Sequence, residues 1–378
     1  MKNLFYILIG ASTVTSPTTS PCIPSSYTSY MSTYNVIVLD TLQTRSDIEG
    51  RTIVCSKLIP VGSTFGNKLT QTSSPFDYTL EINGTTTNTG SNLNIEHGDL
   101  GLGPYSTNRF TLVENSQYKI DNNFYVNINQ GSNGATVKVD NTLPSKCANI
   151  VSSITSLSTT LSQLSPNNVP TYPTNTPGTW KLYVTNVDAN GLAVFNLSLA
   201  TAFDISTVQA LEIIVQNTNV QLVVVNLYGQ SNGVTGTNFI GTWLDSVTTG
   251  RSRTIWNIYQ ATSLKLETNL KGALLAPYAD VTTNINIDGA VAVRSLYTNG
   301  EVHLPLLQFP PCASMSTQLS TASTSTTYKP TTTGTGPTTT GLVGSSTPSS
   351  STYLPTGVST SLISKSIFDK KYSYLPKL

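Results

Sequence analysis

The chain has 378 residues, of which only 10% are charged, and its formal net charge is +1. Ser, Thr and Asn supply most of the polar side chains, which is typical of β-rich extracellular proteins and unlike cytosolic enzymes. Because the chain has no basic cluster, nucleic acid is excluded as an expected partner.

The N-terminus has the features of a secretory signal. Lys2 precedes the apolar run 4–11, which is far shorter than the roughly 20 residues that cross a bilayer. We assign residues 1–18 to a signal peptide and residues 19–33 to a linker. The alternative, a buried N-terminal strand, is at odds with the Ser/Thr/Pro-rich run 16–20.

Short β-type segments begin at Tyr34 with the apolar run 36–39. Glycine-containing turns then divide residues 60–140 into short strands, most clearly at Asn83-Gly84, Asn133-Gly134 and 98–103.

Three segments of the chain share one sequence pattern. Residues 48–58 and 287–296 both read Ile-acid-Gly, then an apolar run, then a basic residue and Ser near a Leu, and residues 270–276 are a shorter relative. Such repeats predict stacked coils, none of which buries its apolar face alone. The structural turns of this repeat are Gly50, Gly272 and Gly289.

The repeats predict a mainly β domain over residues 34–312, a right-handed β-solenoid-like (parallel β-helix) body. The continuous apolar run 222–225 predicts a strand that is buried on both faces. An unpaired terminal coil invites end-to-end association, so we expect a helix or the Cys-linked ends of the domain to cap the stack.

One segment has helical periodicity. Its apolar residues recur at alternating spacings of four and three: Ile150, Ile154, Leu157, Leu161 and Leu164. We predict one helix over about 147–165, which forms because its apolar stripe packs on the β body. The alternative is a polar loop with chance spacing. Residues 166–178 follow as a Pro/Asn/Thr linker.

The four cysteines are Cys22, Cys55, Cys147 and Cys312. An even number in a secreted chain favours disulfides, with three possible pairings. Our hypothesis joins Cys22 to Cys312, which bracket the strand-rich region, and leaves Cys55 with Cys147. The chain has no C-x-x-C spacing, which argues against structural zinc.

Residues 313–378 are predicted to form a disordered, low-complexity Ser/Thr/Pro-rich stalk, because so polar a tract cannot offset its ordering entropy. It has no closing apolar tail, so we expect neither a GPI anchor nor a transmembrane segment. N-glycosylation sequons start at Asn83 and Asn196, and Asn83, in a turn, is the favoured acceptor.

Few residues suggest reaction chemistry. Glu301 and His303 would share one face of a strand, as in a metal site, but a hydrogen-bonded pair that closes the last coil explains them better. Asp47, Glu49 and Asp288 raise the alternative of a glycosidase carboxylate pair. Glu49 and Asp288 precede a Gly at equivalent repeat positions, however, which favours a turn role. We expect no catalytic residue, metal or cofactor, and no enzyme.

Aromatic residues offer a further kind of site. Trp180, Trp243 and Trp256 would suit stacking on sugars, but packing in the core or at its rim is favoured for each. Burial is expected above all for Trp256, which lies in an Ile-Trp-Asn-Ile run.

Taken together, these segments resemble the choice-of-anchor A family, an adhesive domain of secreted surface proteins. The matching pieces are 34–38, 47–51, the helix 150–164, 255–257, 272–279, 287–289 and 300–303, which follow the family's order and cover about residues 34–309. The resemblance implies a secreted β-solenoid-like domain with a packed helix, used in adhesion or as a wall component. It supplies no catalytic residues, and the stalk ends in no sorting signal of the family.

We therefore predict a secreted cell-surface, wall or matrix protein that adheres or self-associates through flat β faces. Its expected partners are a cell-wall or matrix polymer, a host or neighbouring cell surface, or another copy of itself. Ice binding is one alternative, although Thr85-Thr86-Thr87 and Thr282-Thr283 are isolated and form no Thr-x-Thr array. A polysaccharide-active enzyme on a β-helix is the other.

Overall fold

The computed structural model describes residues 22–70, 77–87, 89–128, 136–173, 177–230 and 234–310. All of them belong to one compact unit, Met1–Ser316. The predicted signal peptide, the stalk and the disulfide through Cys312 lie outside the described residues and stay predictions.

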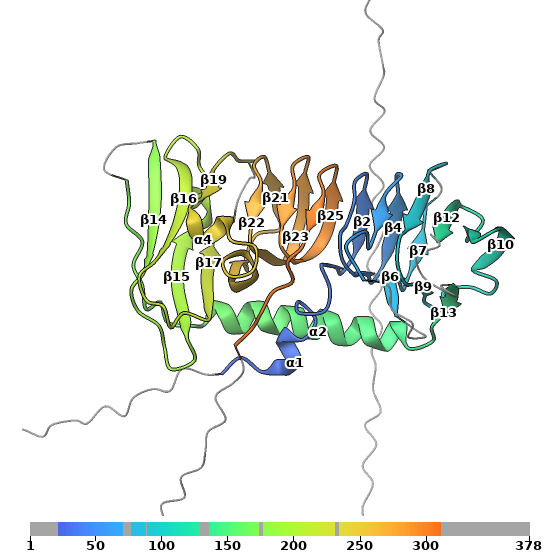
Figure 1. Ribbon diagram of the computed structural model, residues 1–378, viewed down its shortest axis with the longest axis horizontal. Coiled ribbons are helices and arrows are strands. Elements are labelled where there is room, and N and C mark those ends of the chain that lie inside the picture. Colours follow the sequence, from blue (N-terminus) through green and yellow to red (C-terminus); the bar gives the residue numbers. More distant parts are fainter. Residues whose placement is uncertain are drawn as a thin grey trace, which may run out of the picture. The chain divides into compact units, whose positions relative to one another are not determined.

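The described chain is a parallel β-solenoid whose coils each contain up to three short strands (Figure 1). One coil contains β3 (Thr52–Val54), β4 (Lys57–Pro60) and β5 (Thr64–Phe65). The next contains β6 (Tyr78–Ile82), β7 (Thr85–Thr86) and β8 (Asn92–Ile95), and each strand pairs in parallel with its counterpart. Equivalent strands thus form three faces around one apolar interior. The solenoid-like fold class predicted from the repeats is confirmed.

The first face is the longest. Its strands in spatial order are β13 (Val137–Val139), β9 (Asp99–Leu102), β6, β3, β1 (Val36–Val38), β25 (Val291–Thr298), β23 (Ala273–Thr283), β20 (Thr254–Ile258), β17 (Leu222–Tyr228) and β15 (Leu192–Ser198). Spatial order differs from chain order, because β1 near the start of the domain pairs with β25 near its end. The first and last coils therefore meet in the middle of the stack.

The second face is a continuous strip. Its order is β18 (Val234–Thr235), β21 (Ser263–Leu266), the second half of β23, the second half of β25, β2 (Thr41–Thr44), β4 and β7. The long strands β23 and β25 turn the corner from the first face, and the register between them shifts between Ala276 and Asp280.

The third face is interrupted. It contains three separate sheets: β14 (Gly178–Val184) with β16 (Val208–Val215) and β19 (Asn238–Ile240); β22 (Leu270–Lys271) with β24 (Ile287–Asp288) and β26 (Val302–His303); and β5 with β8, β12 (Phe124–Ile128), β11 (Gln117–Ile120) and β10 (Phe110–Glu114). Single bridges from Ile48 to Phe65 and to Val302 connect the last two. Short helical turns lie between strands: α3 (Leu199–Ala202), α4 (Thr242–Asp245) and η1 (Arg251–Arg253).

The three repeat glycines occupy the same corner of the stack: Gly272 and Gly289 lie on adjacent coils, and the coil that contains Val302 separates Gly289 from Gly50. Each glycine lies two positions after a residue of the third face, namely Ile48, Leu270 or Ile287. Parallel pairing among β22, β24 and β26 and the bridge from Val302 to Ile48 link these three residues. A Cβ on Gly289 would lie 2.4 Å from the oxygen of Gly272, and one on Gly50 would lie 2.7 Å from Cβ of Asn35. Close stacking of the coils therefore excludes a side chain at this corner.

A long helix, α2 (Leu143–Ser162), runs along the first face (Figure 1). It starts earlier than predicted, because Pro144 occupies its first turn, where a missing N–H is tolerated. Its apolar stripe packs on side chains that point out of the first face. Leu222 and Val224 face this cluster whereas Val223 and Val225 face the interior, so the strand is buried on both sides as predicted.

One end of α2 is fixed by a disulfide and an ion pair. Cys147 bonds to Cys55, which follows β3. Lys146 Nζ lies 2.7 Å from the buried carboxylate of Glu81 on β6. Tyr34 also donates a 2.5 Å hydrogen bond to Glu81, and burial followed by the Glu81 charge raises the Tyr34 pKa well above its ordinary value. The helix is thereby tied to the N-terminal coils.

An asparagine ladder, Asn196, Asn226 and Asn257 on β15, β17 and β20, fixes the other half of α2. Asn226 Nδ2 donates to the oxygen of Leu161 at 2.7 Å, and Asn257 Nδ2 donates to the oxygen of Ser158 at 2.9 Å. The amides also bond to one another along the ladder. Sequence analysis did not identify it, although each Asn lies between two apolar residues in its strand.

Two elements that the sequence did not indicate lie at the ends of the stack. Asn167, in the predicted linker, pairs with the exposed edge of β15: its Nδ2 donates to the oxygen of Leu192, and its Oδ1 accepts from the N–H of Val194, both at 2.8 Å. At the opposite end the antiparallel pair β10–β11 continues from β12. Helix α2 runs along the coils and caps neither end.

The segment before β1, predicted as a linker, is also structured. It contains α1 (Ser25–Thr28), and its side chains Ile23 and Met31 are buried in the cluster beneath α2. Their burial gives this segment a packing role that its Ser- and Thr-rich composition did not indicate.

Candidate binding surface

The second face presents a row of outward side chains. In register across neighbouring strands this row is Lys265, Thr282, Tyr297, Gln43 and Ile59. Alternate residues such as Leu58, Val281 and Leu296 point into the core. The row mixes a cation, hydroxyls, an amide and an apolar side chain, so it offers a varied surface without a regular array.

Threonines do form a regular rank, but it is buried. Thr44, Thr283 and Thr298 are paired across β2, β23 and β25, and each is at most 3% exposed. Each hydroxyl forms the same pair of hydrogen bonds with the backbone of the residue two positions later. It donates to the backbone oxygen of that residue and accepts from its N–H. These threonines therefore shape the corner between the second and third faces.

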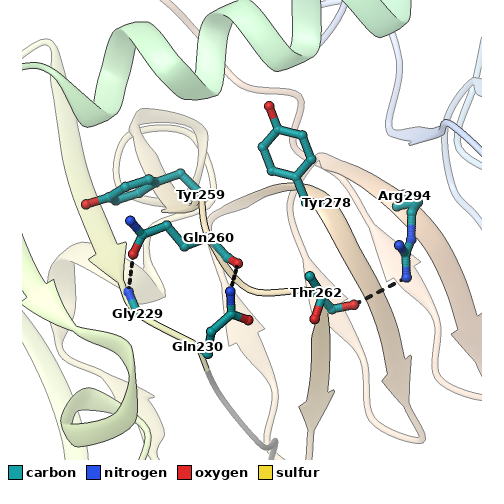
Figure 2. A pocket seen from close by; sticks show the side chains of 7 residues that line it. All are labelled: Gly229, Gln230, Tyr259, Gln260, Thr262, Tyr278 and Arg294. Atoms are coloured by element: carbon teal, nitrogen blue, oxygen red, sulfur yellow. Dashed lines mark hydrogen bonds between the residues drawn. The ribbon is translucent and has the colours of Figure 1, made fainter.

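A corner groove lies between the first and second faces. It has a volume of about 560 Å³ and is lined by Gly229, Gln230, Tyr259, Gln260, Thr262, Tyr278 and Arg294 (Figure 2). Successive coils supply these residues, because the groove follows the ends of β17 and β20 and the bend in β23. Sequence analysis did not select these residues, because only the stacking of coils brings them together.

The polar groups of the groove are held in place. Gln260 Oε1 accepts a hydrogen bond from the N–H of Gly229, and Gln230 Nε2 donates to the oxygen of Gln260, both at 2.6 Å (Figure 2). Arg294 pairs with Asp280 through two bonds of 2.8 and 2.5 Å. These bonds hold the pKa of Asp280 below its ordinary value, so the pair is fully ionised at neutral pH.

The aromatic side chains of the groove are partly exposed. Tyr278 is 43% exposed and points up from its strand, whereas Tyr259 is half-buried and its ring points to the left, away from Tyr278 (Figure 2). Burial, followed by the neighbouring Tyr228, raises the pKa of Tyr259. The three tryptophans behave otherwise: Trp180 and Trp256 are buried in the core, as favoured, and Trp243 packs against it.

Glu301 and His303 do form a hydrogen-bonded pair. His303 Nε2 lies 2.6 Å from Glu301, and Nδ1 lies 2.8 Å from Asp288, whose other oxygen contacts Arg251 at 2.9 Å. Burial alone would lower the pKa of His303, but its hydrogen bonds to Glu301 and Asp288 outweigh burial and raise it. Both ring nitrogens are engaged. Among the described residues no group of three or more His, Cys, Asp or Glu is arranged to hold a metal ion.

The remaining carboxylates have structural partners. Glu49 accepts a 2.8 Å hydrogen bond from the N–H of Leu304, and Asp47 accepts one from Asn67 at 3.2 Å. Glu49 thus bonds to a backbone N–H, as the predicted turn role requires, but this N–H belongs to another coil and not to its own turn. Asp288 instead pairs with the side chains of Arg251 and His303.

The two sequons differ in geometry. Asn83 is half-buried, and its Nδ2, the atom that would carry a glycan, donates to the oxygen of Cys55 at 3.1 Å. Asn196 is exposed at the end of the asparagine ladder, and its Oδ1 accepts from Asn226. No described residue bonds to its Nδ2. The structure thus favours Asn196, whereas the sequence favoured Asn83.

No described helix has both the length and the apolar character needed to cross a membrane. Residues 27–304 match the model of a protein family described as "Putative Ice-binding-like adhesive domain". No curated protein matches the chain.

The chain is similar to solved structures of ice-binding proteins. One is the glycosylated ice-binding protein LeIBP from an Arctic yeast, with 10% identity, a TM-score of 0.33, and coverage of 75% of this chain and 96% of that one. Another is the ice-binding protein of the Antarctic ascomycete Antarctomyces psychrotrophicus, with 9% identity, a TM-score of 0.28, and coverage of 73% and 96%.

Proposed function

The chain belongs to the ice-binding-like adhesive domain family, and from this premise we propose that it is a non-catalytic adhesive protein of the cell surface or wall. It would be secreted, with residues 313–378 acting as a stalk, as the resemblance to choice-of-anchor A proteins implies. The disulfide between Cys55 and Cys147 supports an extracellular location, because disulfides persist in oxidising compartments.

The observation that carries the proposal is the second face. The first face is covered by α2 and the third is broken into separate sheets, whereas the second is continuous from β18 to β7. Its varied row of side chains suits many weak contacts with a polymer or another surface, and several copies acting together would strengthen them.

Cosedimentation with cell-wall material tests this function. Thr282 is exposed in the middle of the second face, so Thr282→Glu places a charge in the proposed contact. The matched control is Gln209→Glu, at an exposed position on β16 of the third face. We expect the wild type and the control to bind wall material and Thr282→Glu to bind about tenfold less tightly, a change of about 1.4 kcal/mol. Equal binding by both variants would refute the second face as the contact.

Ice binding is a second candidate, because the family description names it. It requires a regular exposed array, whereas the regular rank of Thr44, Thr283 and Thr298 is buried. Thermal hysteresis in the wild type that Thr282→Glu abolishes would favour ice over wall material. Release of reducing ends from a glycan panel would favour an enzyme instead.

A further inference from the structure

We propose that the corner groove binds a neutral polysaccharide, with its sugar rings seated against Tyr278 and Tyr259. This inference rests on the proposed adhesive function and names the class of ligand. The groove borders the second face, because Asp280 and Ser263 pair at the start of that face next to Arg294 and Thr262.

The aromatic side chains suit sugar rings. A pyranose ring has an apolar C–H face, which packs on the face of an aromatic ring while the phenol hydroxyl remains available to polar groups. Tyr278 is 43% exposed and neighbouring Tyr228 is 46% exposed, so neither completes the protein core. No described residue hydrogen-bonds to the hydroxyl of Tyr259 or Tyr278. Ligand contact is thus open to both the ring and the hydroxyl of Tyr278.

The amides supply what a sugar hydroxyl needs. One polar atom of each side-chain amide is already bonded within the protein. The Oε1 of Gln260 accepts from the N–H of Gly229, and the Nε2 of Gln230 donates to the backbone oxygen of Gln260. The free ends are the Nε2 donor of Gln260 and the Oε1 acceptor of Gln230, for which no described residue is a partner. A hydroxyl both donates and accepts, so it can use both ends. Because these amides are already oriented, binding loses little side-chain entropy to them.

The charges of the groove favour a neutral ligand. Among the described residues that line the groove, Arg294 alone is charged, and its ion pair with Asp280 offsets its charge. An anionic polymer would gain little attraction and would face the Asp280 carboxylate. Hydroxyl groups, in contrast, can accept from the remaining N–H groups of Arg294 without separating the pair.

The repeat of the groove favours a polymer over a single sugar. Tyr228 ends β17, Tyr259 directly follows β20 and Tyr278 lies in β23, and these three strands are neighbours in the first face. Neighbouring strands lie about 4.8 Å apart, so Tyr259 and Tyr278 line the groove on adjacent coils, and Tyr228, next to Tyr259, lies one coil further along the stack. A chain of pyranose units lying along this axis would meet successive tyrosines.

Affinity gel electrophoresis of the full-length protein tests the proposal. Gels would contain a soluble β-1,3-glucan, a mannan or hydroxyethylcellulose, with polygalacturonate as the anionic comparison. At least one neutral polymer should retard the wild type. Tyr278→Ala and Gln260→Ala should each raise the dissociation constant about tenfold or more, which corresponds to about 1.4 kcal/mol.

Two further variants test whether the aromatic ring of Tyr278 itself accounts for the binding. Tyr278→Phe keeps the aromatic face and should retain most of the affinity. Tyr105→Ala removes a tyrosine that is even more accessible, 64% exposed, in the loop before β10 and should leave the affinity unchanged. Circular dichroism and thermal unfolding of each variant would show that a loss of binding is not a loss of fold.

The outcomes distinguish this proposal from the proposed function. Binding to wall material without retardation by any neutral polymer, or with unchanged affinity in Tyr278→Ala, overturns the groove alone. Retardation only by polygalacturonate, or capture of a protein partner in place of polysaccharide, also overturns it. Failure of the wild type to bind wall material or any polymer refutes the adhesive function and the groove together.

Discussion

The side-chain Nδ2 of Asn35 donates a 3.0 Å hydrogen bond to the backbone oxygen of His303, across 268 positions of the chain. The same amide accepts from the N–H of Gly50 at 3.0 Å and contacts the oxygen of Gly289 at 3.4 Å. One fully buried residue thereby links the two glycine corners at the junction of the first and last coils.

Asn35→Ala should destabilise the protein by about 1–3 kcal/mol, because it leaves the buried N–H of Gly50 without its acceptor and removes one donor each from the oxygens of Gly289 and His303. Urea unfolding measures the change. The control Asn299→Ala removes an exposed amide bond to Asn284 and should stay within about 0.5 kcal/mol of the wild type. Equal effects of the two substitutions would show that the junction does not depend on Asn35.

Removing the disulfide by Cys55→Ala with Cys147→Ala should lower the free energy of unfolding by about 2–4 kcal/mol, since the bond constrains a long loop of the unfolded chain. The two cysteines are 92 positions apart. Thermal unfolding of the double variant against the wild type measures the loss. An unchanged midpoint would mean that Lys146, Glu81 and apolar packing suffice to hold α2.

Asn257→Ala should cost about 1–3 kcal/mol, because its amide is buried and bonds both to Ser158 on α2 and to Asn226. Hydrogen exchange should show faster exchange near Ser158 while the Cys147 end of α2 stays protected. Asn196→Ala, at the exposed end of the ladder, is the comparison and should have a smaller effect. Uniformly faster exchange along α2 would argue against separate anchors.

Stability should depend on pH through His303. Its pKa is raised in the folded state, so its contribution is fully present below the unfolded value near 6.5 and is lost as pH rises through the folded value. The difference in unfolding free energy between the wild type and His303→Gln should therefore shrink as pH increases above about 6.5. A difference that grows with pH would contradict the assignment of a charged imidazole between Asp288 and Glu301.

N-glycosylation should occur at Asn196. In protein from its native source, Asn196→Gln should abolish the mass removed by an amidase that releases N-glycans. Asn83→Gln should leave that mass unchanged and should reduce stability, because Asn83 bonds to Cys55. A glycan mapped to Asn83 on folded protein would contradict the geometry.

Local patterns determined the coils, the helix and the burial of the 222–225 run, because each depends on residues close together in the sequence. The Ile-acid-Gly repeat at Gly50 and Gly289 was enough to predict stacked parallel strands. The spacing of the apolar residues from Ile150 to Leu164 was enough to predict a helix whose apolar stripe needs a β surface, since so Ser- and Thr-rich a helix is marginal alone.

Tertiary structure decided the order of stacking and the positions of the binding groups. Whether β25 pairs with β1 or lies at the far end cannot be deduced from local pattern, because the same repeat stacks equally well in either order. The groove of Tyr259, Tyr278 and Arg294 exists only because separate coils align at one corner. Likewise Asn196, Asn226 and Asn257 are ordinary strand residues until parallel pairing places their amides in contact.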